Sequence, residues 1–112
     1  MRWGLLWLAG AVIMGLATNV WAGVAGWTVP TSVMAVEANQ QGRFTLRLTL
    51  EKSASGCRSV DGFYADYGRD GSELMYRTVL DALVHERKVQ VFATGACDLD
   101  GDSEISSVRI LP

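Results

Sequence analysis

The two cysteines have the most definite chemistry in this 112-residue chain. Cys57 and Cys97 lie 40 positions apart and allow only one internal pairing. A redox pair usually has close C-x-x-C spacing, which is absent here, and a zinc site needs more ligands than two thiols and the single histidine, His85, provide. We therefore predict a structural disulfide between Cys57 and Cys97, with a redox pair and a metal site as the alternatives.

A second chemically suggestive cluster is acidic. Four carboxylates fall within the seven residues from Asp98 to Glu104. Calcium takes roughly six to eight oxygen ligands, so this composition suits a cation. The EF-hand spacing fails, however, because Gly101 is the fourth residue of the segment and Glu104 the seventh. Since the Asp100-Gly101 pair is typical of a tight turn, we expect a turn and no metal site, with a cation site as the alternative.

The sequence contains no recognisable arrangement of catalytic residues. His85 falls at the end of an expected helix, and the residue pattern does not link it to Ser72 or Asp81 in a recognisable triad. A further set of acidic residues consists of Asp61, Asp66 and Asp70. Glycoside hydrolysis needs two carboxylates at a defined separation across a cleft, and the sequence does not show which two of these would form such a pair. We expect no enzyme activity, no catalytic residue and no cofactor.

Two residue types suggest a binding surface. Arg43 and Arg47 share the polar face of an expected strand, where they would suit an anionic ligand such as a sialylated sugar or simply keep that face soluble. Tyr64 and Phe92 also fall on polar strand faces, where an exposed ring can stack on a sugar. A neighbouring loop or subunit would cover the same rings equally well. The ligand-binding residues are therefore left unassigned.

In five segments apolar and polar residues alternate, and this period of two is typical of a half-buried strand. They are residues 27–38, 42–51, 60–67, 88–94 and 104–111. Pro30 interrupts the first, because proline cannot donate to a ladder. In the last, the apolar positions change phase, which predicts a bulge near Ser106-Ser107.

One segment has helical rather than strand periodicity. Residues 72–86 place their apolar side chains on one stripe, which predicts an amphipathic helix. The stripe consists of Leu74, Met75, Val79, Ala82 and Leu83. Asp70 followed by Glu73 predicts an N-cap with an acidic first turn. The order is thus β-β-β-α-β-β, mainly β with one helix, which predicts a five-stranded OB-fold-like barrel; an open sheet with one packed helix is the alternative.

The first 22 residues have the layout of a targeting segment. Arg2 is followed by an uncharged run, and Val20 and Ala22 place small residues before a cut ahead of Gly23. We expect residues 1–22 to be a signal peptide cleaved between Ala22 and Gly23, leaving residues 23–112 as a single OB-like domain; an uncleaved anchor is the alternative. Cleavage would leave no stable membrane span and would place the cysteines in an oxidising compartment, periplasmic or secreted.

Charge argues against a nucleic-acid partner. Ten Lys and Arg face twelve Asp and Glu in the whole chain, and loss of Arg2 reduces the basic residues to nine. The resulting net charge of −3 on the mature chain disfavours a phosphate backbone.

Several motifs carry a family resemblance. They are Gly56-Cys57, Gly62-Phe63-Tyr64, Gly71-Ser72-Glu73-Leu74-Met75, Gly95-Ala96-Cys97-Asp98 and Ser103-Glu104-Ile105. The chain is similar to a group of small secreted bacterial proteins with two cysteines and an OB-like barrel. That group resembles the receptor-binding B subunits of five-subunit bacterial toxins, such as subtilase cytotoxin. The resemblance implies the fold, export, homo-oligomeric ring assembly and glycan binding.

These expectations combine into one function. We expect an exported, non-enzymatic binding module whose ligand is a carbohydrate. The alternative is a periplasmic protein-interaction or inhibitor protein, whose partner would be another protein.

Overall fold

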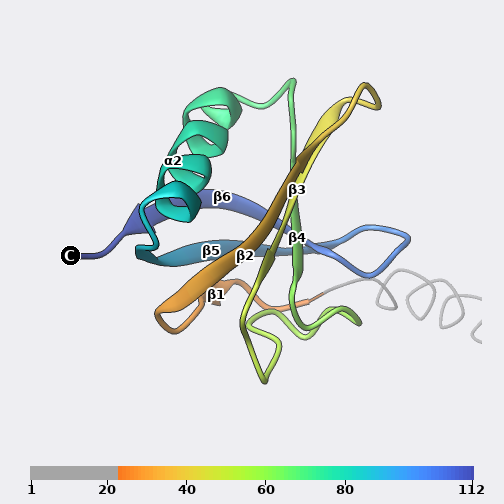
Figure 1. Ribbon diagram of the computed structural model, residues 1–112. Helices are drawn as coiled ribbons and strands as arrows, with labels where there is room; N and C mark the ends of the chain where they lie inside the picture. Colours follow the sequence, from red (N-terminus) through yellow and green to blue (C-terminus); the bar gives the residue numbers. More distant parts are fainter. Residues whose placement is uncertain (1–22) are drawn as a thin grey trace, which may run out of the picture.

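The computed structural model describes residues 23–112, which form six strands and one helix (Figure 1). The elements are β1 (Gly26–Trp27), β2 (Thr31–Ala38), β3 (Arg43–Leu48), β4 (Gly62–Asp66), α2 (Ser72–Val84), β5 (Lys88–Cys97) and β6 (Ser103–Ile110). The expected signal peptide, residues 1–22, lies outside the described residues. The predicted class, mainly β with one helix, is confirmed for the described part of the chain.

The strict alternation in the sequence of β3 decides which face of the strand is buried. Phe44, Leu46 and Leu48 are almost completely buried, whereas Arg43 and Arg47 lie on the opposite face. β5 repeats this pattern, with Val89 and the following alternate residues inside. Because side chains point alternately to the two faces of a strand, both strands contribute one row to a common core.

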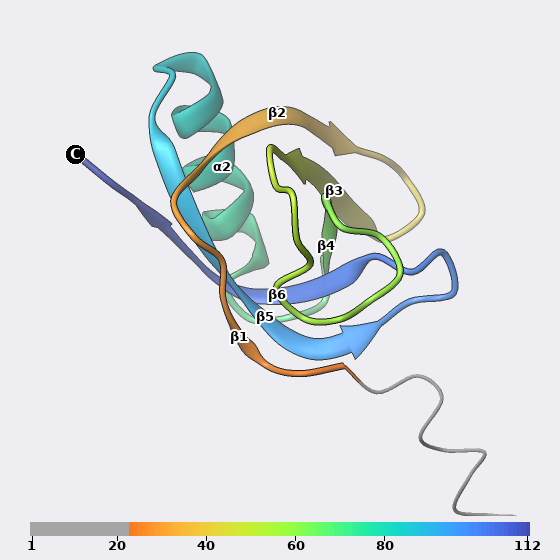
Figure 2. The same ribbon diagram turned by 90° about the horizontal axis from the view of Figure 1, so that it is seen from below.

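The strand pairings form a closed ring. β2, β3 and β4 pair in sequence and antiparallel, and β4 then pairs in parallel with β6. β6 is antiparallel to β5, whose first residues pair with the start of β2 through Thr31 and Ser32. Seen from below, these five strands surround a common centre (Figure 2).

The predicted first strand is divided in two, so the expected count of five strands is wrong. Pro30 lies between β1 and β2, and both strands pair with the same edge of the long strand β5. Thr28 bridges the break: its N–H donates to the Val91 carbonyl at 2.9 Å, and its hydroxyl accepts from the Val91 N–H at 3.1 Å. A side chain therefore completes the ladder where the main chain bends.

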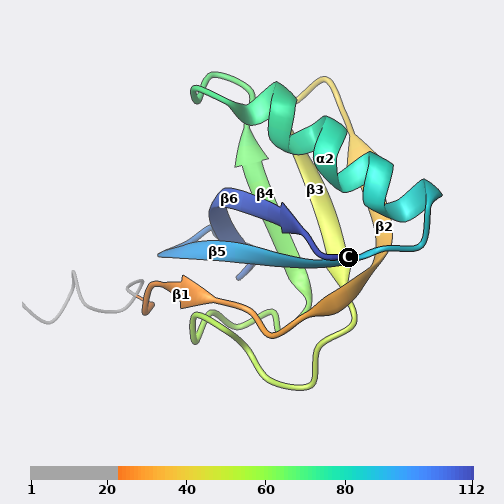
Figure 3. The same ribbon diagram turned by 90° about the vertical axis from the view of Figure 1, so that its left-hand side faces the viewer.

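The helix α2 lies across one side of the strands, opposite β1 (Figure 3). Val79 and Ala82 are fully buried against the core of the sheet, and Tyr76 packs edge-on against Phe44 with ring centroids 5.4 Å apart. Leu74 was expected in the same stripe but is 68% exposed, because only part of the helix circumference faces the sheet. In residues 23–112 no helix combines the length and apolar character needed to cross a bilayer.

The predicted N-cap of the helix is wrong, whereas the predicted bulge is confirmed. Gly71, in the left-handed conformation at φ 83°, caps α2 without a side-chain hydrogen bond, and Asp70 is exposed. In the β5–β6 ladder, Phe92 lies opposite Ser107 and Ala93 opposite Ile105. Ser106 is therefore the extra residue, at the position where the apolar phase changes.

Candidate ligand-binding site

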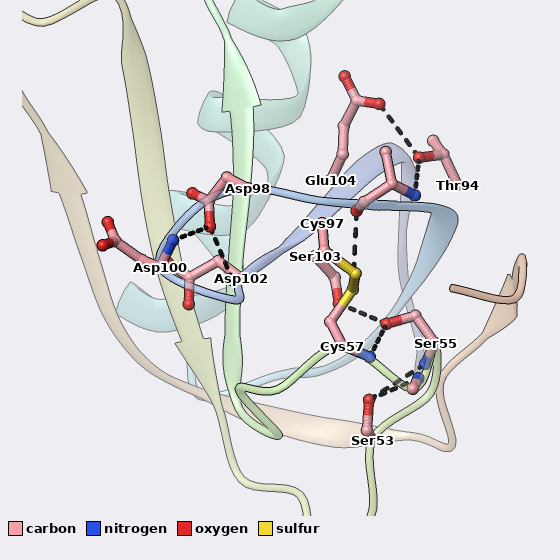
Figure 4. The surroundings of a disulfide bond; sticks show 12 residues. Ser53, Ser55, Cys57, Thr94, Cys97, Asp98, Asp100, Asp102, Ser103 and Glu104 are labelled. Carbon is pink, nitrogen blue, oxygen red and sulfur yellow. Dashed lines mark hydrogen bonds between the residues drawn. A yellow bond between two sulfur atoms is a disulfide. The ribbon is translucent and has the colours of Figure 1, made fainter. Parts of the chain in front are cut away.

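The predicted disulfide is present and joins the loop before β4 to the end of β5 (Figure 4). Cys57 and Cys97 have Cα atoms 5.7 Å apart. Behind the bridge, the hydroxyls of Ser55 and Ser103 form a buried hydrogen bond of 2.6 Å, and the Cys57 N–H donates to the Ser55 hydroxyl. A disulfide of this kind is compatible with an oxidising, extracellular compartment.

The acidic segment forms a turn, as predicted. One oxygen of Asp98 accepts the N–H groups of Asp100 and Asp102 at 3.0 and 2.9 Å (Figure 4). Its other oxygen accepts from Arg43 at 2.8 Å. Among residues 23–112 the histidines, cysteines and carboxylates form no cluster of three arranged to hold a metal. The carboxylate of Asp98 instead organises the backbone of the turn.

Asp102 occupies a position on this turn that disfavours its charged form. Burial raises the pKa of Asp102, and repulsion from Asp98 adds to the effect, while a hydrogen bond with Ser59 opposes it. An acid with a raised pKa in the fold destabilises that fold once it ionises. This destabilisation is absent below the ordinary pKa of an aspartate and fully present above the raised value.

We expect Asp102→Asn to raise the midpoint of thermal unfolding at pH 7, because the neutral amide removes the cost of a half-buried charge. The gain should shrink as the pH falls toward 3, where the wild-type carboxyl is itself protonated. Thermal unfolding followed by circular dichroism across this range tests the expectation. Asp100→Asn, on the exposed part of the turn, controls for the loss of one negative charge. A gain independent of pH would contradict it.

Both arginines on the polar face of β3 form ion pairs. Arg43 pairs with Asp66 at 3.0 Å and with Asp98 at 2.8 Å. Arg47 pairs with Asp61 at 3.0 Å. These carboxylates neutralise the arginines, so an anionic ligand would have to displace an ion pair on this face.

Tyr64 and Phe92 are less accessible than their strand faces suggested. Tyr64 is only 6% exposed, and the guanidinium of Arg43 lies 4.0 Å from its ring centroid. Burial raises the pKa of Tyr64, as does the neighbouring Glu104. Phe92 is half-buried and contacts Trp27 edge-on. Of the two possibilities that the sequence left open for these rings, stacking on a ligand and coverage by neighbouring residues, the structure favours coverage.

Of the residues weighed for catalysis, His85 and Asp81 are in contact, whereas Ser72 lies at the other end of the helix. His85 is exposed at the end of α2, where its ring contacts the carboxylate of Asp81 one turn earlier at 3.0 Å. Ser72 begins the same helix, about 20 Å away at 1.5 Å per residue. Asp61 and Asp66 are each paired with a different arginine.

A hollow that sequence analysis missed lies between β1 and the loop after β3. We call it the Trp27 hollow. Its lining is Trp27, Thr28, Val29, Thr49, Leu50, Glu51, Lys52, Ser53 and Ala54, and its volume is ≈ 410 Å³. Trp27 is 41% exposed. Its indole is held by Arg109, whose guanidinium lies 4.1 Å from the ring centroid, and by the edge of Phe92. The ring is thus both fixed and accessible.

Three polar side chains of the Trp27 hollow, those of Glu51, Lys52 and Ser53, can still bind a ligand. Within residues 23–112, neither Glu51 nor Lys52 forms a salt bridge, and both are exposed. The Ser53 hydroxyl accepts two backbone N–H groups, from Ser55 and Gly56, which leaves its own proton to donate. The sequence did contain a signal that could have indicated this site: Trp27 is the one tryptophan after residue 22.

A second hollow of the same volume, ≈ 410 Å³, lies between the loop after β4 and β6. Its lining has two acidic residues, the exposed Asp70 and Glu104, of which Glu104 is already bound by Arg69 at 3.1 Å and by the Thr94 hydroxyl at 3.1 Å. No aromatic ring lines it. The Trp27 hollow is therefore the better candidate for a ligand.

Comparison with known proteins does not decide between these sites. No protein-family model matches the chain, and no curated protein matches it.

Proposed function

We propose that this protein is an exported, non-enzymatic binding module that holds a carbohydrate in the Trp27 hollow. The observation that carries the proposal is a fixed, exposed indole beside three polar side chains that, within residues 23–112, keep hydrogen-bonding capacity for a ligand. A sugar ring has an apolar C–H face that packs on an aromatic ring and hydroxyls that need donors and acceptors around it. Trp27 supplies the platform, while Glu51, Lys52 and Ser53 supply the polar contacts.

We propose further that the ring of strands is an OB-type barrel with β1 as an added edge. The order β2-β3-β4-β6-β5, with one helix between β4 and β5, supports this assignment. Likeness to toxin B subunits and assembly into a homo-oligomer belong to the same proposal, supported by the sequence motifs and the disulfide.

We expect Trp27→Ala to weaken glycan binding about tenfold or more, because stacking on an aromatic ring is worth that much where it has been measured for planar ligands. The measurement is binding of the labelled mature domain to a glycan array, followed by calorimetry with the best-bound sugar. Trp27→Phe keeps an aromatic platform and should retain part of the affinity.

Leu74→Ala provides a matched control, since Leu74 is an exposed apolar residue on α2, away from the hollow. Its affinity should equal that of the wild type. An array without signal, together with one protein recovered in pull-downs, would favour the protein-interaction alternative. Unchanged binding by Trp27→Ala would move the site away from this hollow.

A further inference from the structure

The nitrogen of the expected cleavage site is hydrogen-bonded inside the fold. Gly23 follows the cut predicted after Ala22, so its backbone nitrogen belongs to the peptide bond that would be hydrolysed. That nitrogen donates to the Gly95 carbonyl at 2.7 Å. The next N–H, of Val24, donates to the Ser55 carbonyl at 2.7 Å. The segment then continues into the pairing of β1 with β5.

The space around Gly23 is too small for any other residue. A Cβ atom there would lie 2.6 Å from the Ser55 carbonyl oxygen and 2.8 Å from that of Gly95. Both atoms belong to the backbone and have no flexible side chain to move aside. Gly95 is constrained in turn, because its φ is +98° and a Cβ on it would approach Gly23 to 3.2 Å. The two glycines allow the segments around residues 23 and 95 to approach each other closely.

The disulfide holds together the two groups that receive this segment. Ser55 lies two residues before Cys57, and Gly95 lies two residues before Cys97. The position that a Gly23 Cβ would occupy is 3.5 Å from the Cys57 sulfur. Residues 23 and 24 therefore lie against the bridged loop, and closure of the bridge completes their binding site.

We propose that the cleavage of this chain before Gly23 precedes its folding, because the oxidised domain protects its own cleavage site. A peptidase binds its substrate as an extended, unpaired segment, so a docked segment is cut only after local opening. Hydrolysis adds the water oxygen to the carbonyl carbon of Ala22, which becomes a carboxylate, and both water protons to the nitrogen of Gly23. The resulting ammonium then donates to the Gly95 carbonyl as a charge-assisted hydrogen bond, which is stronger than that of an amide.

The test uses the purified full-length precursor in detergent micelles, treated with signal peptidase. Cleavage is followed by mass spectrometry, which also identifies the bond that is cut. We expect the oxidised, folded precursor to be cut at least about tenfold more slowly than the reduced precursor, because two backbone hydrogen bonds must open first. Equal rates, or a cut at a different bond, would overturn the proposal.

Two glycine variants separate docking from general stability. Gly23→Ala should be cut almost as fast when oxidised as when reduced, since its methyl group prevents docking. Gly68→Ala, in an exposed loop with no atom within 4 Å of the added methyl, should remain as slow as the wild type. A slow Gly23→Ala would contradict the proposal.

Hydrogen exchange gives a second readout that does not depend on any variant. The Val24 amide of the oxidised, mature wild-type domain should exchange slowly, because it donates to the Ser55 carbonyl. Exchange at the rate of an unstructured terminus would show that the segment is not docked and would overturn the proposal.

Discussion

Removing the disulfide should lower the free energy of unfolding of the mature domain by about 4 kcal/mol. The bridge closes a loop with a sequence separation of 40 residues, and in the chain-entropy model a loop of that size restricts the unfolded chain by about this amount. For a domain of about 90 residues, the loss corresponds to a drop of roughly 20 °C in the unfolding midpoint. The variant Cys57→Ser/Cys97→Ser, followed by thermal unfolding, measures it.

The reducing agent provides the control. Dithiothreitol should lower the midpoint of the wild-type domain to that of the double variant and should leave the double variant unchanged. The contacts behind the bridge, including the Ser55–Ser103 hydrogen bond, should weaken in both cases. An unchanged midpoint, or free thiols in protein purified from the periplasm, would show that the bridge does not stabilise this domain.

We expect Val79→Asp to prevent folding. Val79 is fully buried between α2 and the sheet, and the residues around it are apolar. A carboxylate there would lose its hydration without gaining a partner. That cost is comparable with the whole stability of a domain, about 5–15 kcal/mol. Far-ultraviolet circular dichroism and a loss of the cooperative thermal transition would record the result.

Arg77→Ala is the matched control on the same helix. Arg77 is exposed and pairs with Glu73 one turn earlier at 2.8 Å, an arrangement worth about 0.5 kcal/mol or less. Its unfolding midpoint should stay close to that of the wild type. A folded Val79→Asp domain with a wild-type transition would mean that α2 does not cover the core in this way.

Local patterns were enough to predict most of the elements. The alternation from Arg43 to Leu48 predicts both the strand and its buried face, because side-chain direction in a strand depends only on odd and even position. The phase change at Ser106 predicts the bulge for the same reason. With only two cysteines, the disulfide required no knowledge of the fold.

Such local patterns could not predict contacts between residues that are far apart in the sequence. Arg43 meets Asp98, 55 positions later, and this pair gives a structural role to an arginine for which the sequence had left ligand contact and solubility open. Leu74 repeats the helical stripe and is nevertheless exposed, since only part of the helix circumference packs on the strands. Pro30 was recognised as a break, but the pairing of both halves with β5 was not.

The sequence by itself determined most of the secondary structure, the disulfide and the expectation of export, since each rests on neighbouring residues or on a count. Only the tertiary structure decided which polar groups neutralise each other and which remain free. It brought Trp27 beside the loop of residues 49–54, and it placed Gly23 against Gly95 and Ser55. The physical reason is that a binding surface depends on which segments the closed ring of strands brings together, and that closure is a property of the whole chain.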